Sequence, residues 1–294
     1  MLDFLRYIQF GGKELREMVD FLCDKIGLDI YGEHMEIGYE DELSGKTTLH
    51  QMCIRDRPIT DDICKMVLEC RAGEHGITAP GQFINIKIDG LFLRRPISIC
   101  DWTETTVTVI YKVVGRGTEL LKTYEPGRQL NALSALGNGF APARAGQRPL
   151  LIGGGVGVPP LYGLCRNLIE AGARPTVILG FNTEREVFYK EEFEKLGAEV
   201  LVATADGSMG QKGFVTDALQ SLKEPETFFY TCGPEPMLKA LDKALAEGLE
   251  GEMSFEERMG CGFGACMGCS CETRYGAKRI CKDGPVLERS EILW

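Results

Sequence analysis

The sequence lacks the features that mark membrane and secreted proteins. No apolar run approaches about 18 residues, the length that a membrane-spanning helix needs. The first residues, MLDFLRYIQFGG, lack a basic segment followed by a long apolar stretch, as a secretory signal would require. We also find no internal repeats and no low-complexity tracts. The sequence therefore predicts a cytoplasmic globular protein with no membrane association.

Basic residues are in deficit as well. The chain has 33 Lys and Arg against 43 Asp and Glu, a formal net charge of -10. Nucleic-acid binding needs a basic patch that neutralises phosphates. The charge balance therefore argues against a nucleic-acid partner.

The composition is otherwise that of an ordinary globular protein, and only the cysteines are unusual. With 294 residues, 44% of them apolar, the chain can form two domains and a small appendage without disulfide staples. Five of the twelve cysteines crowd positions 261–281. One dense cluster in a long, cytosolic-type chain favours metal ligation over a disulfide framework. The other seven are scattered singly: Cys23, Cys53, Cys64, Cys70, Cys100, Cys165 and Cys232.

Changes in pattern divide the chain into four parts. The pattern of residues 1–57 differs from that of the rest of the chain, and MCIRDR at 52–57 resembles a translated sequencing adapter. We therefore expect residues 1–57 to be a chimeric segment. The alternative is a natural N-terminal extension. Short alternating segments over 58–143 predict an antiparallel β-barrel. Strand–helix alternation over 144–250 predicts an α/β unit with a doubly wound parallel sheet. The Gly- and Cys-rich residues 251–294 form a third unit.

The stretch LLIGGGVGVPPLYGL predicts a strand, a glycine loop and a helix start. Such a loop lets the backbone approach a pyrophosphate, which the helix N-terminus then attracts. The alternative is a turn that only packs strand against helix. The glycines concerned are Gly153, Gly154, Gly155 and Gly157.

Two later stretches extend this nucleotide-binding prediction. ATADGSMGQKG has Asp206 and no arginine near the expected ribose, which favours NAD over NADP. In FFYTCGPEPM, Cys232, Gly233 and Pro234 end a strand where a nicotinamide could reach. For Cys232 alone, the simpler interpretation is a small buried apolar residue.

The barrel segment carries two weaker phosphate signals. Arg95 in LRRPISI could hold a phosphate, and Ser98 could hydrogen-bond a flat ring. Gly115, Gly117 and Thr118 in VVGRGTELL form a second backbone-and-hydroxyl cradle.

The cysteine cluster offers five candidates for four ligand positions. The spacing Cys261-x4-Cys266-x2-Cys269 is the plant-type ferredoxin arrangement, whereas zinc ribbons more often use two separate C-x2-C pairs. The prediction is an iron–sulfur cluster rather than zinc. The spacing alone leaves Cys271 and Cys281 as alternatives for the fourth ligand.

Taken in order, these motifs resemble the ferredoxin reductase superfamily: R-P-x-S, G-x-G-T, G-G-G-x-G-x-x-P and C-G-P-x-P-M. With the C-terminal cysteines, residues 58–294 resemble the family of electron transfer subunits of NAD-dependent dihydroorotate dehydrogenase. The resemblance implies FAD in the barrel, NAD in the α/β unit and a [2Fe–2S] cluster. It implies FAD contacts from Arg95, Pro96, Ile97, Ser98, Tyr111, Lys112, Val113, Gly117 and Thr118. It implies NAD contacts from Gly153, Gly154, Gly155, Gly157, Cys232, Gly233 and Pro234, and cluster ligation by Cys261, Cys266, Cys269 and Cys281.

The resemblance also implies an activity in pyrimidine biosynthesis. An FMN-containing catalytic subunit oxidises dihydroorotate, and electrons pass through the cluster and FAD of this chain to NAD+. The implied assembly is a heterotetramer of two plus two subunits, and no residue of this chain acts as a general acid or base. The first barrel strand of the family is expected to be replaced by residues 1–57.

Two alternatives remain at this point. One is the small flavin and iron–sulfur subunit of another NAD(P)H-dependent enzyme, such as an electron-bifurcating ferredoxin:NADP+ reductase or a sulfide dehydrogenase. The other is a non-catalytic binding module that carries zinc.

Overall fold

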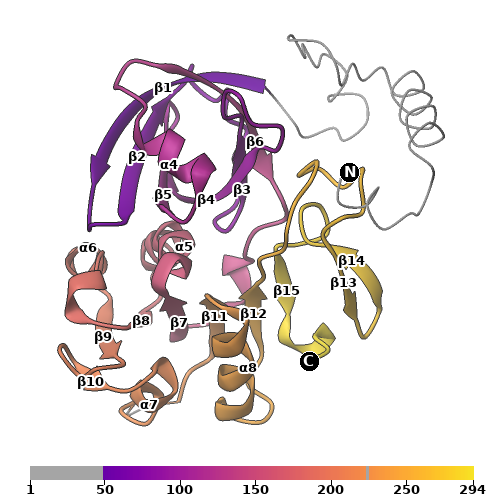
Figure 1. Ribbon diagram of the computed structural model, residues 1–294. Helices are drawn as coiled ribbons and strands as arrows, with labels where there is room; N and C mark the ends of the chain where they lie inside the picture. Colours follow the sequence, from indigo (N-terminus) through magenta and orange to yellow (C-terminus); the bar gives the residue numbers. More distant parts are fainter. Residues whose placement is uncertain (1–48, 223–224) are drawn as a thin grey trace.

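The computed structural model describes the backbone of residues 49–222 and 225–294, and the side chains from residue 58 onward. Three units follow one another along the chain: a β-barrel, an α/β unit below it in Figure 1, and a C-terminal unit beside both. The predicted multidomain fold class is confirmed. No helix in the described part of the chain has the length and apolar character to cross a bilayer.

The barrel is closed by six antiparallel strands in the order β1-β2-β5-β4-β3-β6. Alternate residues of these strands fill its interior, as the period of a strand requires, and Ile84, Ile86, Val107 and Val109 are fully buried there. The short helix α4 (Arg116–Lys122) lies between the last two strands in sequence. The strands are β1 (Leu49–Pro58), β2 (Ile63–Glu69), β3 (Phe83–Ile86), β4 (Arg95–Trp102), β5 (Thr106–Lys112) and β6 (Gln129–Leu136).

The barrel starts earlier than the predicted boundary at residue 58. Strand β1 contains the MCIRDR stretch and pairs with both β2 and β6, so these residues close the barrel. Ladder pairing needs only extended backbone, so a strand can form here whatever the origin of its sequence. The rest of the predicted atypical segment, residues 1–48, lies outside the described residues.

The α/β unit has a seven-stranded sheet in the order β10-β9-β8-β7-β11-β12-β15. All neighbouring strands are parallel except β12 and β15, and the strand order reverses between β7 and β11. The predicted alternation of strands and helices is present. The strands are β7 (Pro149–Gly154), β8 (Thr176–Phe181), β9 (Glu199–Thr204), β10 (Gln211–Lys212), β11 (Phe228–Cys232), β12 (Gly251–Ser254) and β15 (Val286–Glu288). The helices are α5 (Pro159–Glu170), α6 (Lys190–Leu196), α7 (Val215–Leu219) and α8 (Glu235–Ala244), with 3-10 turns η1 (Pro142–Arg144), η2 (Gly155–Gly157) and η3 (Glu184–Glu186).

The C-terminal unit begins after β12, not at residue 251 as predicted. Strands β12 and β15 both belong to the seven-stranded sheet, and the cysteine-rich segment lies between them in sequence. This segment contains the hairpin of β13 (Ser270–Thr273) and β14 (Gly276–Arg279), and the turn η4 (Arg289–Glu291) follows β15. The prediction missed this arrangement because the pairing of β12 with β15 joins residues far apart in the chain.

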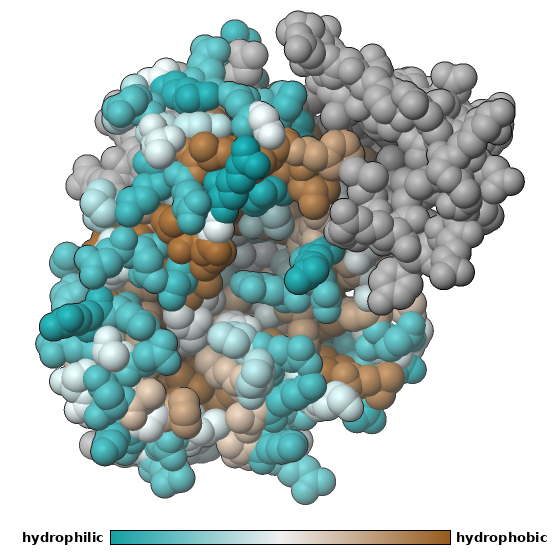
Figure 2. Space-filling model, in the orientation of Figure 1, coloured by the Kyte–Doolittle hydropathy of each residue, from teal (hydrophilic) through white to brown (hydrophobic). Residues whose placement is uncertain are grey.

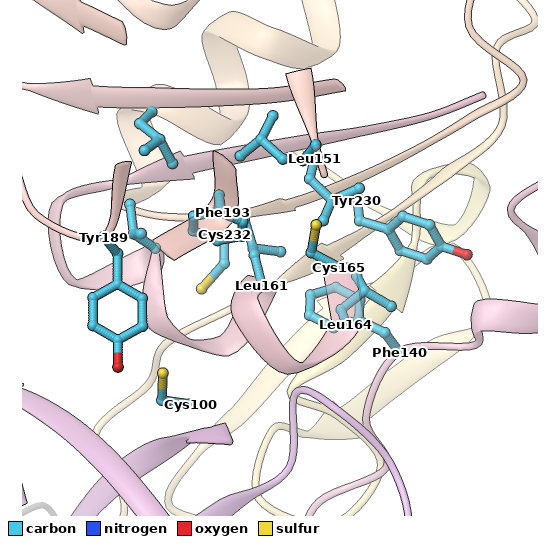
Figure 3. Packing of buried hydrophobic residues seen from close by; sticks show 14 of the residues in the cluster. Cys100, Phe140, Leu151, Leu161, Leu164, Cys165, Tyr189, Phe193, Tyr230 and Cys232 are labelled. Carbon is cyan, nitrogen blue, oxygen red and sulfur yellow. The ribbon is translucent and has the colours of Figure 1, made fainter. Parts of the chain in front are cut away.

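Helix α5 joins the barrel to the α/β unit. A Cβ added at Gly163 would lie only 3.0 Å from the Cys100 carbonyl oxygen of β4, so the helix packs directly on the strand. Beside this contact, Arg166 Nη1 lies 2.7 Å from Asp101 Oδ1. Figure 3 shows the Tyr189 side chain directed toward Cys100 across the same junction. The two units are therefore held by close packing and by an ion pair.

Candidate functional site

The glycine loop lies at the carboxyl end of β7, where the strand order of the sheet reverses. After β7 ends at Gly154, the chain forms η2 and enters α5 at Pro159. A Cβ at Gly157 would lie 2.2 Å from the Cys232 carbonyl oxygen, so no other residue fits this approach to β11. Ligands bind at such a reversal in open α/β sheets.

A cavity of about 600 Å³ lies against this loop. Its walls come from the carboxyl ends of β7, β8 and β11, from the start of α7 and from the rim of the barrel. In Figure 2, hydrophilic residues cover most of the visible face and hydrophobic patches lie between them. Among the predicted residues, the cavity is lined by Lys112, Gly154, Gly155, Gly157, Gly233 and Pro234.

Three of the residues predicted to be near NAD do not line the cavity: Gly153, Cys232 and Asp206. Gly153 serves packing, since a Cβ there would lie 2.9 Å from Val158 Cγ2. The Cys232 side chain is buried within the apolar core (Figure 3), and burial raises the pKa of its thiol to about 12. Asp206 does not line the cavity; its carboxylate accepts hydrogen bonds from the backbone and hydroxyl of Ser208.

Three acidic cavity residues were not predicted: Asp62, Glu186 and Glu256. Lys112 Nζ lies 3.0 Å from Asp62 Oδ2, and this hydrogen bond lowers the pKa of the Asp62 carboxyl. Glu186 accepts hydrogen bonds from the backbone and side-chain amides of Asn182. Glu256 is an exposed residue at the cavity, where desolvation by neighbouring atoms raises the pKa of its carboxyl. Of the three, only Glu256 could have been found from the sequence, because it follows the carboxyl end of a strand by two residues. Asp62 and Glu186 belong to no spaced motif.

The predicted FAD residues gather on β4, β5 and the start of α4. The Arg95 guanidinium covers Gly117, where a Cβ would lie 2.1 Å from Arg95 Nε. Nη1 of Arg95 donates to the Leu93 carbonyl oxygen at 2.6 Å. The Thr118 hydroxyl accepts from the backbone N–H of Val114 at 2.9 Å. An arginine side chain and a threonine hydroxyl thus lie beside the same short turn, which fits a phosphate-binding cradle.

The remaining predicted FAD residues differ in how their side chains lie. Ile97 and Tyr111 are buried in the barrel core, so only their backbone can face a ligand. Pro96 is exposed, and Ser98 and Val113 are partly buried.

The four predicted cluster cysteines lie together as a row of thiols. Cys266 contacts Cys261, Cys261 contacts Cys281, and Cys281 contacts Cys269. Hydrogen bonds from Cys266 and Cys281 lower the pKa of Cys261, and one from Cys281 lowers that of Cys269 to about 7. Cys271 stands outside this row, and burial raises the pKa of its thiol.

Backbone N–H groups point at the sulfurs of this row. Cys261 Sγ accepts from Ala265 at 3.2 Å and from Cys266 at 3.4 Å, while Cys269 Sγ accepts from Cys281 at 3.4 Å. Within the residues that the structure describes, no three His, Cys, Asp or Glu side chains surround a single point as one metal ion requires. Four neighbouring thiols with N–H donors directed at their sulfurs fit the ligand set of an iron–sulfur cluster.

The turn that carries these cysteines depends on positive φ angles. Gly262 has φ +85° and Gly264 has φ +92°, values that favour glycine, and Met267 has φ +58°. Arg279 braces the turn: its Nη1 donates to the Gly264 carbonyl oxygen at 3.0 Å while its Nε lies 2.9 Å from Asp283 Oδ2.

Two family models match the parts of the chain that carry the cysteine row and the glycine loop. Residues 256–293 match the iron–sulfur cluster binding domain of dihydroorotate dehydrogenase B, and residues 151–243 match the oxidoreductase NAD-binding domain. The dihydroorotate dehydrogenase B (NAD(+)) electron transfer subunit of Geobacillus sp. (strain WCH70) is 44% identical, covering 82% of this chain and 96% of that protein. The same subunit of Shouchella clausii (strain KSM-K16) is 43% identical, with the same coverage.

A solved structure of an NADH-dependent reduced ferredoxin-NADP oxidoreductase is also similar. Its TM-score is 0.75 and its sequence is 29% identical, covering 83% of this chain and 90% of that chain.

Proposed function

The chain belongs to the family of electron transfer subunits of NAD-dependent dihydroorotate dehydrogenase B, and from this premise we propose how its residues carry the electrons. The thiol row holds a [2Fe–2S] cluster, the barrel holds FAD, and the cavity holds NAD. When bound, the cluster supplies one-electron transfer, NAD supplies hydride transfer, and FAD converts between the two. The observation that carries this proposal is that the barrel contacts both sites: Lys112 lines the cavity and Asn85 contacts the cysteine turn.

At the barrel, we propose that Arg95 and the cradle of Gly117 and Thr118 bind the FAD pyrophosphate. The partly buried Ser98 side chain is then free to hydrogen-bond the flavin ring. Pro96, Ile97, Tyr111, Lys112 and Val113 complete the site along the two strands, Ile97 and Tyr111 through their backbone. The domain boundaries that go with these roles are 49–143 for the barrel and 144–254 for the α/β unit, with β15 added to its sheet.

In the cavity, we propose that the glycine loop binds the NAD pyrophosphate and that Gly233 and Pro234 face the nicotinamide. Among the described residues that line the cavity, the only basic one is Lys112, which is paired with Asp62. Glu186 and Glu256 add negative charge. A 2′-phosphate would find no arginine here, which supports NAD over NADP.

At the cluster, we propose ligation by Cys261, Cys266, Cys269 and Cys281. Met267 stands between two of these ligands and exposes 52% of its surface. We propose that the catalytic subunit, with its FMN, docks over this residue, so that electrons enter the chain through the cluster. We further propose an assembly of two plus two subunits in the cytoplasm, where cysteines stay reduced.

Reconstitution tests this function directly. The full chain is co-expressed with the catalytic subunit from the same source, and orotate formation from dihydroorotate is followed. We expect activity that requires this chain and NAD+. Absence of activity with both flavins and the cluster present would refute the assignment and point to a ferredoxin-type partner, as in the NADH-dependent ferredoxin-NADP oxidoreductase.

Resequencing the source gene tests the origin of residues 1–57. We propose that part of this segment is foreign, on the strength of the adapter-like MCIRDR stretch. An uninterrupted natural reading frame through this region would refute that origin.

A further inference from the structure

Asn85 is a buried amide on the face of β3 that is turned toward the cysteine unit. Its neighbours Ile84 and Ile86 pack inside the barrel, whereas Phe83 belongs to a second apolar cluster that includes Cys269 and Cys281 of the C-terminal unit. Because successive strand residues point to opposite faces, Asn85 shares the face of Phe83. Its side chain is 1% exposed.

This side chain is in direct contact with the turn of the first predicted ligand. Asn85 Nδ2 donates to the Cys261 carbonyl oxygen at 3.4 Å. A Cβ added at Gly262 would lie only 2.4 Å from the same nitrogen. The backbone of Cys261 and Gly262 is therefore in van der Waals contact with the Asn85 amide.

An amide at this position lowers the stability of the fold if its only role is packing. Asn85 Oδ1 is buried and finds no hydrogen-bond partner in the described structure. A buried acceptor without a partner destabilises the fold. An apolar side chain, such as that of Leu133 opposite on β6, fills the same face without this cost. The position of the N–H donor, against the Cys261 carbonyl oxygen, therefore indicates a role at the cysteine turn.

We propose that Asn85 is a positioning residue for electron transfer between the cluster and the flavin. Its hydrogen bond fixes the Cys261 turn against a strand of the flavin barrel and so sets the geometry between the two centres. This inference rests on the proposed function, in which Cys261 is a ligand and the barrel holds FAD. Small misplacements of reacting groups cost large factors in rate.

Anaerobic reduction of the full, cofactor-loaded chain by NADH tests this role. NADH loses a hydride and becomes NAD+; the flavin takes both electrons and passes one to the cluster, which is reduced by one electron. Stopped-flow absorbance follows cluster reduction, and the reduced cluster is examined by electron paramagnetic resonance. NADH oxidation by ferricyanide reports the flavin alone.

For Asn85→Leu we expect normal FAD content and normal ferricyanide activity. Cluster reduction should slow by about fivefold, the factor that corresponds to one neutral hydrogen bond, and the resonance spectrum should change. The matched control is Asn131→Leu, which also removes an amide whose buried oxygen has no hydrogen-bond partner. Asn131 lies on β6, and among the described residues its side chain makes no hydrogen bond to the cysteine turn. It should reduce its cluster at the wild-type rate.

An unchanged rate and spectrum in Asn85→Leu would overturn the proposal, as would an equal loss in Asn131→Leu. If Asn85→Leu loses its iron, the smaller Asn85→Ala variant decides, since it removes the donor without adding bulk or charge. A wild-type rate there overturns the role, and a slowed rate supports it. A wild-type chain that binds neither iron nor FAD would instead refute the proposed function.

Discussion

Replacing Gly157 by alanine should weaken NAD binding more than it weakens the fold. The added Cβ would lie 2.2 Å from the Cys232 carbonyl oxygen and 2.7 Å from Gly233 Cα. Both are backbone atoms at the wall of the cavity, so neither can rotate away. Relief requires η2 to move off β11, which displaces the loop that faces the pyrophosphate.

The expected magnitude follows from this overlap. Overpacking of a close contact typically costs about 1–3 kcal/mol, and each 1.4 kcal/mol corresponds to about tenfold in an equilibrium constant. We therefore expect KM for NADH to rise by roughly 5- to 150-fold in ferricyanide reduction, with normal FAD content. The control is Gly172→Ala, which has φ +88° and nothing within 4 Å of an added Cβ. It should lower stability while leaving KM unchanged.

A KM for NADH within twofold of wild type in Gly157→Ala would refute this reasoning. The loop would then have enough freedom to absorb a methyl group, and the close approach of η2 to β11 would not define the NAD site.

Three further predictions concern the other sites. Cys266→Ser should abolish the iron–sulfur absorbance while NADH oxidation by ferricyanide persists, whereas Cys271→Ser should keep the cluster; iron retained in Cys266→Ser would disprove the ligand assignment. Arg95→Ala should lose FAD at least tenfold more readily, because one charged phosphate contact disappears; flavin content after gel filtration measures this. The pKa of Asp62 is lowered by Lys112, so its stabilisation is present above the unfolded pKa of about 3.9 and is lost as the pH falls through the lower folded value. Asp62→Asn should therefore flatten the acid side of the melting-temperature profile, and an unchanged profile would contradict this.

Local patterns were enough to predict the parts of the fold that depend on short stretches of chain. The loop after β7 and the helix α5 follow from glycines and prolines whose roles are set by neighbouring backbone. The cysteine spacing left Cys271 and Cys281 as alternatives, and only the resemblance favoured Cys281. In the structure Cys281 lies in the thiol row and Cys271 does not.

Other features depend on contacts between distant residues, which no local pattern encodes. Asn85 and Cys261 are 176 positions apart, and their contact arises only when barrel and cysteine unit pack together. The sequence also did not predict that the Tyr111 side chain points into the barrel core, because a motif gives the order of residues but not the face of the strand on which each one lies. Asp206 was expected beside the ligand because it follows a sheet strand, yet its carboxylate turns back to Ser208.

The return of the chain to the sheet as β15 has a consequence for how electrons travel. Many carriers sit on flexible tethers and deliver electrons by swinging between partners. Here both ends of the cysteine-bearing segment are strands of one sheet, paired with each other at Ser254 and Val286. Such a double anchor leaves no tether to swing. The cluster is therefore held at a fixed position relative to the sheet. We expect the rate of electron transfer between the cluster and the flavin to be independent of the viscosity of the solvent.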